Sequence, residues 1–134
     1  MAKIGFLLVG HGSKKPYNMQ LINNTAKIIA EKEEGYIVKT GFMEFNEPTI
    51  PEALETFRNE DIEVLQVFPL FLARGMHIDR DIPEILGIEE GGHKGTFKLK
   101  DKEIPLIFAD PIGENELLAD LMIANGKQAL DDYL

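Results

Sequence analysis

Two histidines far apart in the chain are the residues best suited to chemistry. His11 directly follows the short apolar segment 4–9 and lies in the motif Gly10-His11-Gly12-Ser13. His77 follows a second apolar segment, 64–68, after a short loop. The carboxyl ends of parallel strands share one edge of an α/β sheet, where ligands bind, so we expect both imidazoles to face one cleft. Neutral imidazoles bind metal ions and accept protons, which makes the pair a candidate for metal chemistry.

The pair suits an open metal site rather than a structural one. If the strands that precede the histidines are neighbours, they lie about 4.8 Å apart and both imidazoles reach one ion. A structural zinc site needs four protein ligands, and the chain has no cysteine. Two histidines therefore favour a divalent ion that is held loosely and passed on. The alternatives are that His11 is an ordinary hydrogen-bonded turn residue and that His77 is a solvated loop residue.

Three further features near this edge have more than one interpretation. Glu44 and Glu47 follow the apolar segment 36–42, and either carboxylate could bind a cation, relay protons or simply be solvated. The turn around His11 leads into a helix and could bind phosphate at the helix N-terminus, but it matches neither the Walker motif nor the dinucleotide motif. His93 lies in a glycine-rich loop and is interpreted as solvated.

The elements that must position these residues alternate between strand and helix. Short apolar segments predict strands, and apolar residues at helical spacing predict helices. Thr49-Ile50-Pro51-Glu52 has the pattern of a capping box, and Asp79 or Asp81 is predicted to cap a short helix after His77. The predicted strands are 3–9, 36–42, 62–68 and 105–109, and the predicted helices are 18–33, one that starts at Thr49, a short one before Gly87, and Glu114–Leu130.

This order of elements predicts a single α/β domain over residues 1–134. A parallel four-stranded sheet with right-handed crossovers carries helices on both faces. Residues 87–95 predict a mobile loop, and residues 96–104 predict a small hairpin. The closing helix is expected to turn its apolar residues inward: Leu117, Leu118, Leu121, Met122 and Leu130. Four strands are few for such a sheet, so a second copy of the chain is expected to cover one edge or face, which favours a homodimer.

Composition excludes several classes of function. A chain of 134 residues with 44% hydrophobic residues has the size and apolar content of one domain. Its formal net charge of -9 argues against a general nucleic-acid binder, which needs a basic face. No segment approaches the roughly 20 apolar residues of a membrane span. The segment Met1-Ala2-Lys3 has no signal-peptide pattern, so a cytoplasmic location is expected.

Five motifs, in order along the chain, resemble those of a known family. They are residues 9–13 (VGHGS), 41–49 (GFMEFNEPT), 69–77 (PLFLARGMH), 81–86 (DIPEIL) and 110–113 (DPIG). Together they resemble the small archaeal CbiX-type sirohydrochlorin chelatases, and the resemblance covers nearly the whole chain. It implies the flavodoxin-like chelatase fold and a homodimer that mimics the two halves of longer chelatases and ferrochelatases.

The resemblance also implies an activity and the residues that carry it. Such enzymes insert Co2+ into sirohydrochlorin for cobalamin biosynthesis and, in methanogens, Ni2+ for the nickel tetrapyrrole of methyl-coenzyme M reductase. The metal ion is a substrate, and no prosthetic group is expected. His11 matches the family's metal ligand and proton acceptor, His77 matches a second metal ligand, and Glu47 matches a substrate-contacting glutamate. The substrate-contacting loop matches Leu72, Ala73, Arg74, Gly75, Met76 and His77.

Two residues depart from the family pattern. Arg74 stands where relatives have a small residue, serine or histidine, and it could alter the metal's surroundings or pair with a substrate carboxylate. Some relatives have a histidine-rich tract after the short helix, where this chain has only His93.

The chemistry of metal insertion fits these residue types. Insertion of a divalent ion expels two pyrrole protons, and the ordinary pKa of imidazole, about 6.5, suits a proton acceptor at neutral pH. We hypothesise an ordered hand-over in which His11 and His77 hold the ion, the pyrrole nitrogens displace them, and the freed imidazole takes a proton. Arg74, Arg80 or Lys14 could balance the substrate's carboxylates. The rival functions are a non-catalytic carrier of tetrapyrrole or metal, and a flavodoxin-like module that binds a phosphorylated ligand.

Overall fold

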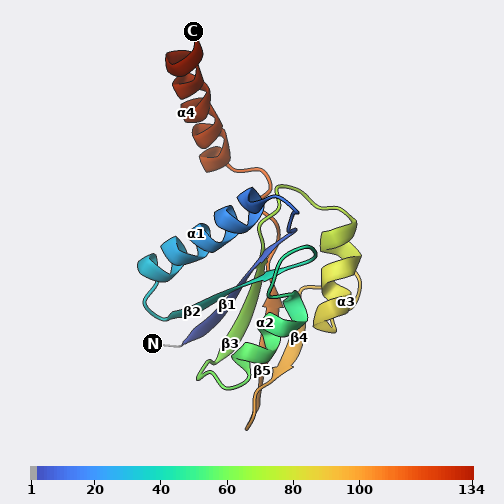
Figure 1. The fold of residues 1–134 in the computed structure, drawn as a ribbon. Coiled ribbons are helices and arrows are strands. Elements are labelled where there is room, and N and C mark those ends of the chain that lie inside the picture. Colours follow the sequence, from blue (N-terminus) through green and yellow to red (C-terminus); the bar gives the residue numbers. More distant parts are fainter. Residues whose placement is uncertain (1–2) are drawn as a thin grey trace.

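A five-stranded sheet forms the centre of the protein (Figure 1). The computed structural model describes residues 3–134. The strands are β1 (Ile4–Gly10), β2 (Tyr36–Phe42), β3 (Val64–Pro69), β4 (Lys94–Lys98) and β5 (Glu103–Phe108), in the order β2-β1-β3-β5-β4. Four of them are parallel, and β4 runs antiparallel to β5. The predicted α/β class is confirmed, whereas the predicted count of four strands is wrong because β4 adds an antiparallel edge.

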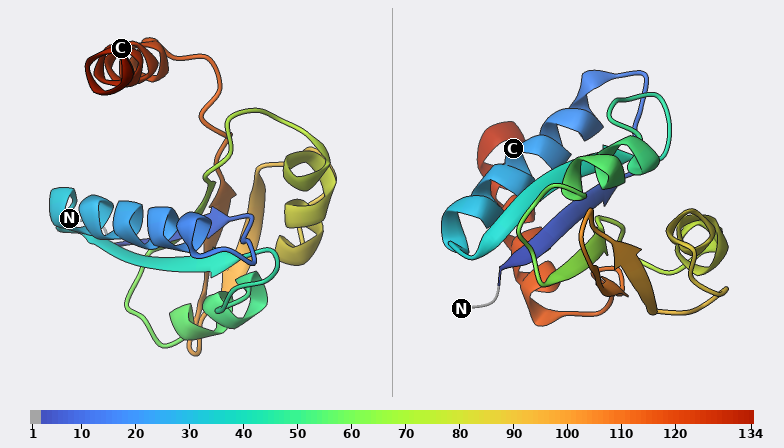
Figure 2. Two further views of the ribbon diagram at one scale, coloured as in Figure 1. Left: turned by 45° about the horizontal axis from the view of Figure 1, so that its top comes forward. Right: turned by 90° about the horizontal axis from the view of Figure 1, so that it is seen from below.

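Helices cover both faces of the sheet, as predicted (Figure 2). The helices are α1 (Pro16–Lys32), α2 (Ile50–Phe57), α3 (Ile82–Leu86) and α4 (Glu116–Tyr133). On one face, α1 packs Ile22 and Ala26 against the side chains of β1 and β2. On the other face, α2 and α3 pack against β1, β3 and β5 and enclose the larger core. Because successive residues of a strand point to opposite faces, β1 contributes side chains to both cores.

The hairpin was only partly predicted. Residues 96–104 were expected to form a small hairpin apart from the last strand, but β5 itself is the second arm of the hairpin. Phe97 of β4 and Ile104 of β5 pair across the ladder and are both buried in the larger core. Burial of one face of β4 therefore joins the hairpin to the main sheet. The segment 87–95 contains the buried Ile88, and the mobility predicted for it stays a prediction.

The helix after β2 begins as its sequence predicts. The Thr49 N–H donates to Glu52 Oε1 at 2.8 Å, and the Glu52 N–H donates to Thr49 Oγ1 at 3.3 Å, which completes the capping box. The pKa of Glu52 lies below its ordinary value. The larger cause is the backbone hydrogen bond from Thr49, and a hydrogen bond with the Thr49 side chain adds to it. This box fixes the start of α2 directly after the loop that carries Glu44.

The short helix before Gly87 begins in an unexpected way. A π-helical turn, η1 (His77–Asp81), leads directly into α3, and Asp81 has helical backbone angles with no side-chain cap. The prediction that Asp79 or Asp81 caps this helix is wrong. Both carboxylates instead bind side chains: Asp79 accepts from Arg74, and Asp81 contacts His77. π-helical turns are rare and often occur at functional sites.

The closing helix stands clear of the rest of the chain (Figures 1 and 2). α4 has no buried residue, so the expectation that its leucines and Met122 turn inward is wrong. Its large apolar side chains are instead exposed: Leu117, Met122 and Leu130 are 75%, 65% and 59% exposed. Within residues 3–134, no helix is both long enough and apolar enough to cross a bilayer.

Candidate metal site

The structure brings the two predicted histidines together. β1 and β3 are parallel neighbours, so the loops that follow them meet at the carboxyl edge of the sheet. The ring centroids of His11 and His77 are 5.1 Å apart, with the ring planes at 62°. Their side chains are 41% and 39% exposed. The two imidazoles therefore lie beside each other, each partly exposed, at this edge of the sheet.

Hydrogen bonds between two loops fix the position of His11. The Met43 N–H donates to the Gly10 carbonyl at 3.0 Å, and the Glu44 N–H donates to the His11 carbonyl at 3.1 Å. These bonds extend the pairing of β1 with β2 past the ends of both strands. The loop after β2 is thereby held beside the histidine.

Gly12 is required by the closeness of these loops. Its φ is +89°, and a Cβ at this position would lie 1.8 Å from the Glu44 carbonyl oxygen. The Gly12 N–H donates to Asn18 Oδ1 and the Ser13 N–H donates to Asn46 Oδ1, each at 2.9 Å. Asn18 and Asn46 therefore hold the turn, a role that no local sequence pattern predicted.

Each imidazole has one nitrogen fixed by an oxygen acceptor. His11 Nδ1 lies 3.1 Å from the Gly12 carbonyl oxygen, and His77 Nδ1 lies 2.9 Å from Asp81 Oδ2. A carbonyl and a carboxylate only accept, so the neutral rings carry their proton on Nδ1. Each Nε2 then keeps its lone pair for a metal ion or a proton.

The π-helical turn sets the second of these contacts. His77 and Asp81 are four residues apart and lie on one side of the turn. Asp81 also accepts from Arg80, whose hydrogen bond is the largest cause that lowers the pKa of this carboxyl, and the hydrogen bond with His77 adds to it. An ionised carboxylate behind a metal-binding imidazole orients the ring and raises its basicity. Asp81 therefore belongs to the site, and its i, i+4 spacing from His77 was the signal for it.

Of the two glutamates, Glu44 is the one that contacts a histidine. Glu44 Oε1 lies 3.6 Å from His11 Nε2, and its side chain is 49% exposed. Glu47 is also exposed and lies further along the same loop. Within residues 3–134, no three His, Asp or Glu side chains are arranged as a closed metal site. The present donors are thus two imidazoles with one carboxylate alongside.

One aromatic ring packs against both histidines, and the loops that carry the site expose further apolar side chains. The Phe71 ring packs edge-on to both, with centroids 6.4 Å from His11 and 6.0 Å from His77. Phe45, in the loop held beside His11, is 57% exposed and has a φ of +67°, which is uncommon for a bulky residue. Leu72 and Met76 are 61% and 57% exposed. Phe71 and Phe45 were not predicted as site residues, because sequence spacing alone does not show which aromatic rings lie beside the imidazoles.

The predicted substrate loop, from Leu72 to His77, is exposed up to the histidine. Arg74 donates from Nε and Nη2 to Asp79 Oδ1 at 3.0 and 2.7 Å, and this contact raises the pKa of Arg74 above its ordinary value.

A cavity of about 390 Å³ lies beside Arg74 and is lined by Ala73, Arg74, Asp110, Pro111, Gly113 and Glu114. His93 reaches the edge of this cavity: its Nδ1 lies 2.9 Å from the Phe108 carbonyl oxygen and its Nε2 lies 3.5 Å from Asp110 Oδ1.

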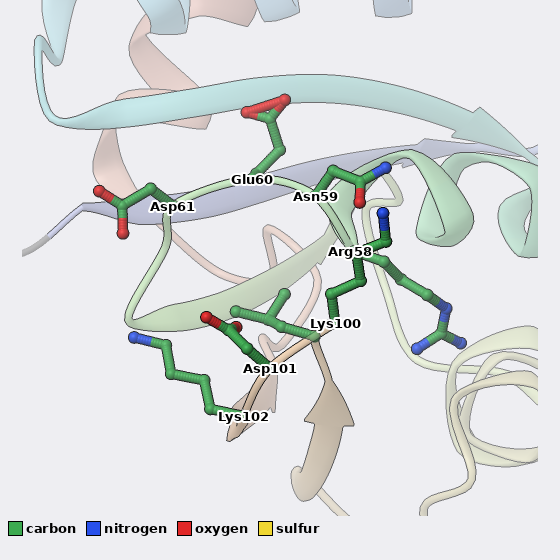
Figure 3. A pocket seen from close by; sticks show the side chains of 8 residues that line it. Arg58, Asn59, Glu60, Asp61, Lys100, Asp101 and Lys102 are labelled. Atoms are coloured by element: carbon green, nitrogen blue, oxygen red, sulfur yellow. The ribbon is translucent and has the colours of Figure 1, made fainter.

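A second cavity, of about 380 Å³, lies at the opposite end of the sheet (Figure 3). Its walls are the segment before β3 and the turn between β4 and β5, so it is at the amino edge of the parallel strands. Arg58 of this cavity is already bound to Glu55 and stacks over Phe97, 4.8 Å from the ring centroid. No histidine lines this cavity. Its lining contains both acidic and basic side chains, so its charge does not favour one kind of ligand.

Comparison with known proteins shows the family of the chain. A family model described as CbiX matches residues 5–129. The chain belongs to the CbiX family. A sirohydrochlorin cobaltochelatase of Methanosarcina barkeri is 44% identical over 128 residues, which cover 96% of this chain and 98% of the relative. The protein of the same name from Methanosarcina acetivorans is 42% identical over the same shares of both chains.

Two solved structures share the fold of this chain. A CbiX protein from Marinobacter aquaeolei VT8 superposes with a TM-score of 0.68 at 23% identity, over 96% of this chain and 98% of that chain. The sirohydrochlorin chelatase SirB from Bacillus subtilis subspecies spizizenii, in complex with cobalt, gives a TM-score of 0.75 at 22% identity. In that comparison 94% of this chain is covered but only 50% of SirB. The CbiX chain described here thus has the chelatase fold in about half the length of SirB.

Proposed function

We propose that this chain is a sirohydrochlorin chelatase that inserts Co2+ into its tetrapyrrole substrate, as the cobaltochelatases to which it is similar are named to do. The observation that carries the proposal is the 5.1 Å separation of the His11 and His77 rings at the carboxyl edge of the sheet. The 44% identity with the Methanosarcina barkeri enzyme over nearly the whole of both chains supports the same substrate.

The separation of the rings suits a single ion. A first-row ion bound at about 2.1 Å from an imidazole nitrogen lies roughly 3.2 Å from the ring centroid. Two centroids 5.1 Å apart are separated by less than twice this distance, so the spacing allows both rings to bind one ion. Two imidazoles leave the other coordination positions to water or to pyrrole nitrogens. Without thiolate ligands the ion is held weakly enough to be passed on.

The proton balance gives the histidines a second task. Sirohydrochlorin loses two pyrrole N–H protons as the ion enters, and the ion leaves the imidazoles as its bonds to the ring nitrogens form. We assign His11 as the base for one of these protons, while the other passes to solvent water, because the His11 Nε2 lone pair is then free and Glu44 Oε1, 3.6 Å away, stabilises the imidazolium. His77, whose Nδ1 is held by Asp81, acts as a ligand. Glu47 and the loop Leu72–Met76 are proposed to contact the substrate.

The surroundings of the pair suit a flat, polycarboxylate ring. Exposed Phe45, Leu72 and Met76 offer apolar contacts to the macrocycle. Arg74 and Arg80 are bound to Asp79 and Asp81, which leaves each of them less able to neutralise a substrate carboxylate. Lys14, which lies over the Phe45 ring at 5.7 Å from the centroid, is the better partner of the three.

Occupied backbone donors weigh against the phosphate-binding alternative. A phosphate at the turn after β1 would need the N–H groups of Gly12 and Ser13, but these donate to Asn18 and Asn46. The N–H of Lys15 donates to Ser13 Oγ at 3.2 Å. The carrier alternative uses the same cleft, so only turnover separates it from an enzyme.

Two finer statements belong to the proposal. We propose that Ni2+ is accepted as well as Co2+, because both ions take imidazole ligands and the site is open. We propose that the chain works as a homodimer, since it covers only half of SirB and leaves α4 without a partner.

The test is a metallation assay in which Co2+ or Ni2+ is mixed with sirohydrochlorin and the protein without oxygen. The metal and the sirohydrochlorin are in excess over the protein, and the absorption spectrum of the tetrapyrrole reports the reaction. An enzyme forms many equivalents of product per chain at a rate above the spontaneous one. Product limited to one equivalent per chain identifies a carrier, and a rate equal to the protein-free control rejects both. Sedimentation equilibrium on the same sample gives the oligomeric state.

A further inference from the structure

We propose that Phe45 positions the tetrapyrrole substrate beside His11, and that a strained backbone turn holds its ring in place for this task. The inference rests on the proposed function and deepens it, because it assigns a residue that orients the macrocycle before the ion enters. It starts from two properties of Phe45 that packing within the chain does not explain, its backbone conformation and its exposure.

The backbone of Phe45 adopts a rare conformation. Its φ is +67°, and among residues 3–134 it is the only residue other than glycine with a positive φ. The Asn46 N–H donates to the Glu44 carbonyl, two residues earlier, at 2.8 Å. A hydrogen bond of this span around a residue of positive φ marks a γ-turn of the rare, strained kind. Glycine would adopt this conformation without the clash that a Cβ causes, so a phenylalanine here lowers the stability of the chain.

Hydrogen bonds to the turn after β1 hold the γ-turn on both sides. Before it, the Glu44 N–H donates to the His11 carbonyl at 3.1 Å. After it, Asn46 Oδ1 accepts from the Ser13 N–H at 2.9 Å. Strained backbone persists only where the surrounding structure fixes it, and such residues gather at sites that bind ligands. The place of Phe45 relative to the His11 turn is therefore fixed.

Packing of the Phe45 ring within the chain does not offset this strain. The side chain is 57% exposed and belongs to neither of the two hydrophobic cores. Met43, in the same loop, packs against the larger core, so another residue already anchors the loop. The Lys14 ammonium, on an exposed side chain, lies 5.7 Å from the centroid of the Phe45 ring. The strained turn thus presents an aromatic ring and a cation to a ligand.

This pair of groups suits a flat, conjugated ligand with carboxylates at its edge. Aromatic rings pack against other π-systems in offset or edge-on arrangements, and an ammonium group pairs with a carboxylate. Sirohydrochlorin, the substrate proposed above, combines both features. Phe45 directly follows Glu44, whose Oε1 lies 3.6 Å from His11 Nε2. A macrocycle that rests on the Phe45 ring is therefore held next to the base, while His11 and His77 hold the ion.

Binding of metal-free sirohydrochlorin tests the ring directly. The dissociation constant is measured without oxygen, from the absorption spectrum of the tetrapyrrole, for the natural chain, Phe45→Ala, Phe45→Gly and Phe45→Tyr. Loss of the ring should raise it at least about 10-fold, the effect of losing contact over roughly half of the exposed ring surface. Phe45→Tyr keeps the ring and should stay within about 2-fold of the natural chain. Unchanged dissociation constants in both Phe45→Ala and Phe45→Gly overturn the proposal.

The affinity for Co2+ alone separates positioning of the substrate from support of the metal site. A calorimetric titration should give the same dissociation constant for Co2+ in the natural chain and in Phe45→Gly, because the ring contacts the macrocycle and not the ion. A loss of Co2+ affinity that matches the loss of sirohydrochlorin affinity would make Phe45 a support of the loop and overturn the proposal. Ile85→Ala, which removes a 40% exposed apolar side chain from α3, is the control and should bind both ligands normally.

Thermal stability tests the strain without any ligand. Glycine normally lowers stability relative to alanine, because it has more freedom in the unfolded chain. At Phe45 the order should be reversed, with the Tm of Phe45→Gly above that of Phe45→Ala by roughly 3 °C. A Tm of Phe45→Gly equal to or below that of Phe45→Ala overturns the strained turn.

Failure of the inference can be told apart from failure of the proposed function. If the natural chain binds sirohydrochlorin but does not accelerate its metallation, the chelatase activity is rejected, and the comparison of dissociation constants still decides on Phe45. If the natural chain metallates sirohydrochlorin and loss of the ring changes neither the dissociation constant nor KM, the function stands and the role of Phe45 is overturned. A natural chain that does not bind sirohydrochlorin overturns both.

Discussion

The replacement of Gly12 by alanine tests how the site is held together. A Cβ on Gly12 would lie 1.8 Å from the Glu44 carbonyl oxygen, and real Cβ contacts are not shorter than 3.0 Å, so the two loops must separate by about 1.2 Å. The backbone angle adds to the problem, because the φ of +89° costs an alanine about 1–2 kcal/mol. The separation also breaks the 3.1 Å hydrogen bond from the Glu44 N–H to the His11 carbonyl, worth about 1 kcal/mol.

These costs predict a measurable loss of both stability and activity. The free energy of unfolding should fall by about 2–3 kcal/mol, which for a chain of this size lowers Tm by roughly 8–12 °C. A displacement of about 1 Å between His11 and Glu44 should lower the rate of metal insertion by about 100-fold. Differential scanning calorimetry and the metallation assay measure the two effects. Gly75→Ala is the control for stability, because a Cβ there has no atom within 4 Å, and its Tm should not change. A Gly12→Ala protein with the Tm and the rate of the natural chain would refute the reasoning.

Two further predictions concern single contacts. Removing the carboxylate behind His77 in Asp81→Ala should lower the affinity for Co2+ by about 10–100-fold in a calorimetric titration, because the ring loses its orienting partner. Asp79→Ala, which breaks only the Arg74 pair, should bind Co2+ normally, and equal affinities of the two variants would contradict the role of Asp81. For Glu52, whose pKa is lowered by the hydrogen bonds with Thr49, the stabilisation exists above the unfolded-state pKa and is lost as the pH falls through the lower folded-state value. The Tm of Glu52→Gln should therefore be lower than that of the natural chain at pH 7, and this difference should disappear toward about pH 3. A Tm difference that does not depend on pH would show that the capping carboxylate does not act through its charge.

The sequence predicts best where local pattern and topology agree. The β2 strand occurs at the predicted residues, Tyr36–Phe42, because the segment is rich in aromatic and β-branched residues, which favour strands. The capping box of Thr49 and Glu52 forms as predicted, since both of its hydrogen bonds are local. The pairing of His11 with His77 follows from the rule that parallel strands share their carboxyl edge, once β1 and β3 are neighbours.

The failures occur where the outcome depends on distant surfaces. An amphipathic pattern shows that α4 has an apolar side, but it does not say which surface that side meets, and so the expected inward packing was wrong. Asp81 could either cap a helix or orient an imidazole, and only the π-helical turn decides for the second. Phe71 joins the site because its ring lies within 6.4 Å of both histidine rings, which sequence spacing does not reveal.

The central claim is that His11 and His77 together hold the ion that enters the tetrapyrrole, and the rate of Co2+ insertion into anaerobic sirohydrochlorin tests it most directly. The natural chain is compared with His11→Ala, His77→Ala and, as the control, His93→Ala, whose ring contacts the Phe108 carbonyl and Asp110. The account predicts that each of the first two variants falls toward the spontaneous rate and that His93→Ala keeps the rate of the natural chain. Full activity in both His11→Ala and His77→Ala, in proteins with an unchanged fold, would contradict it.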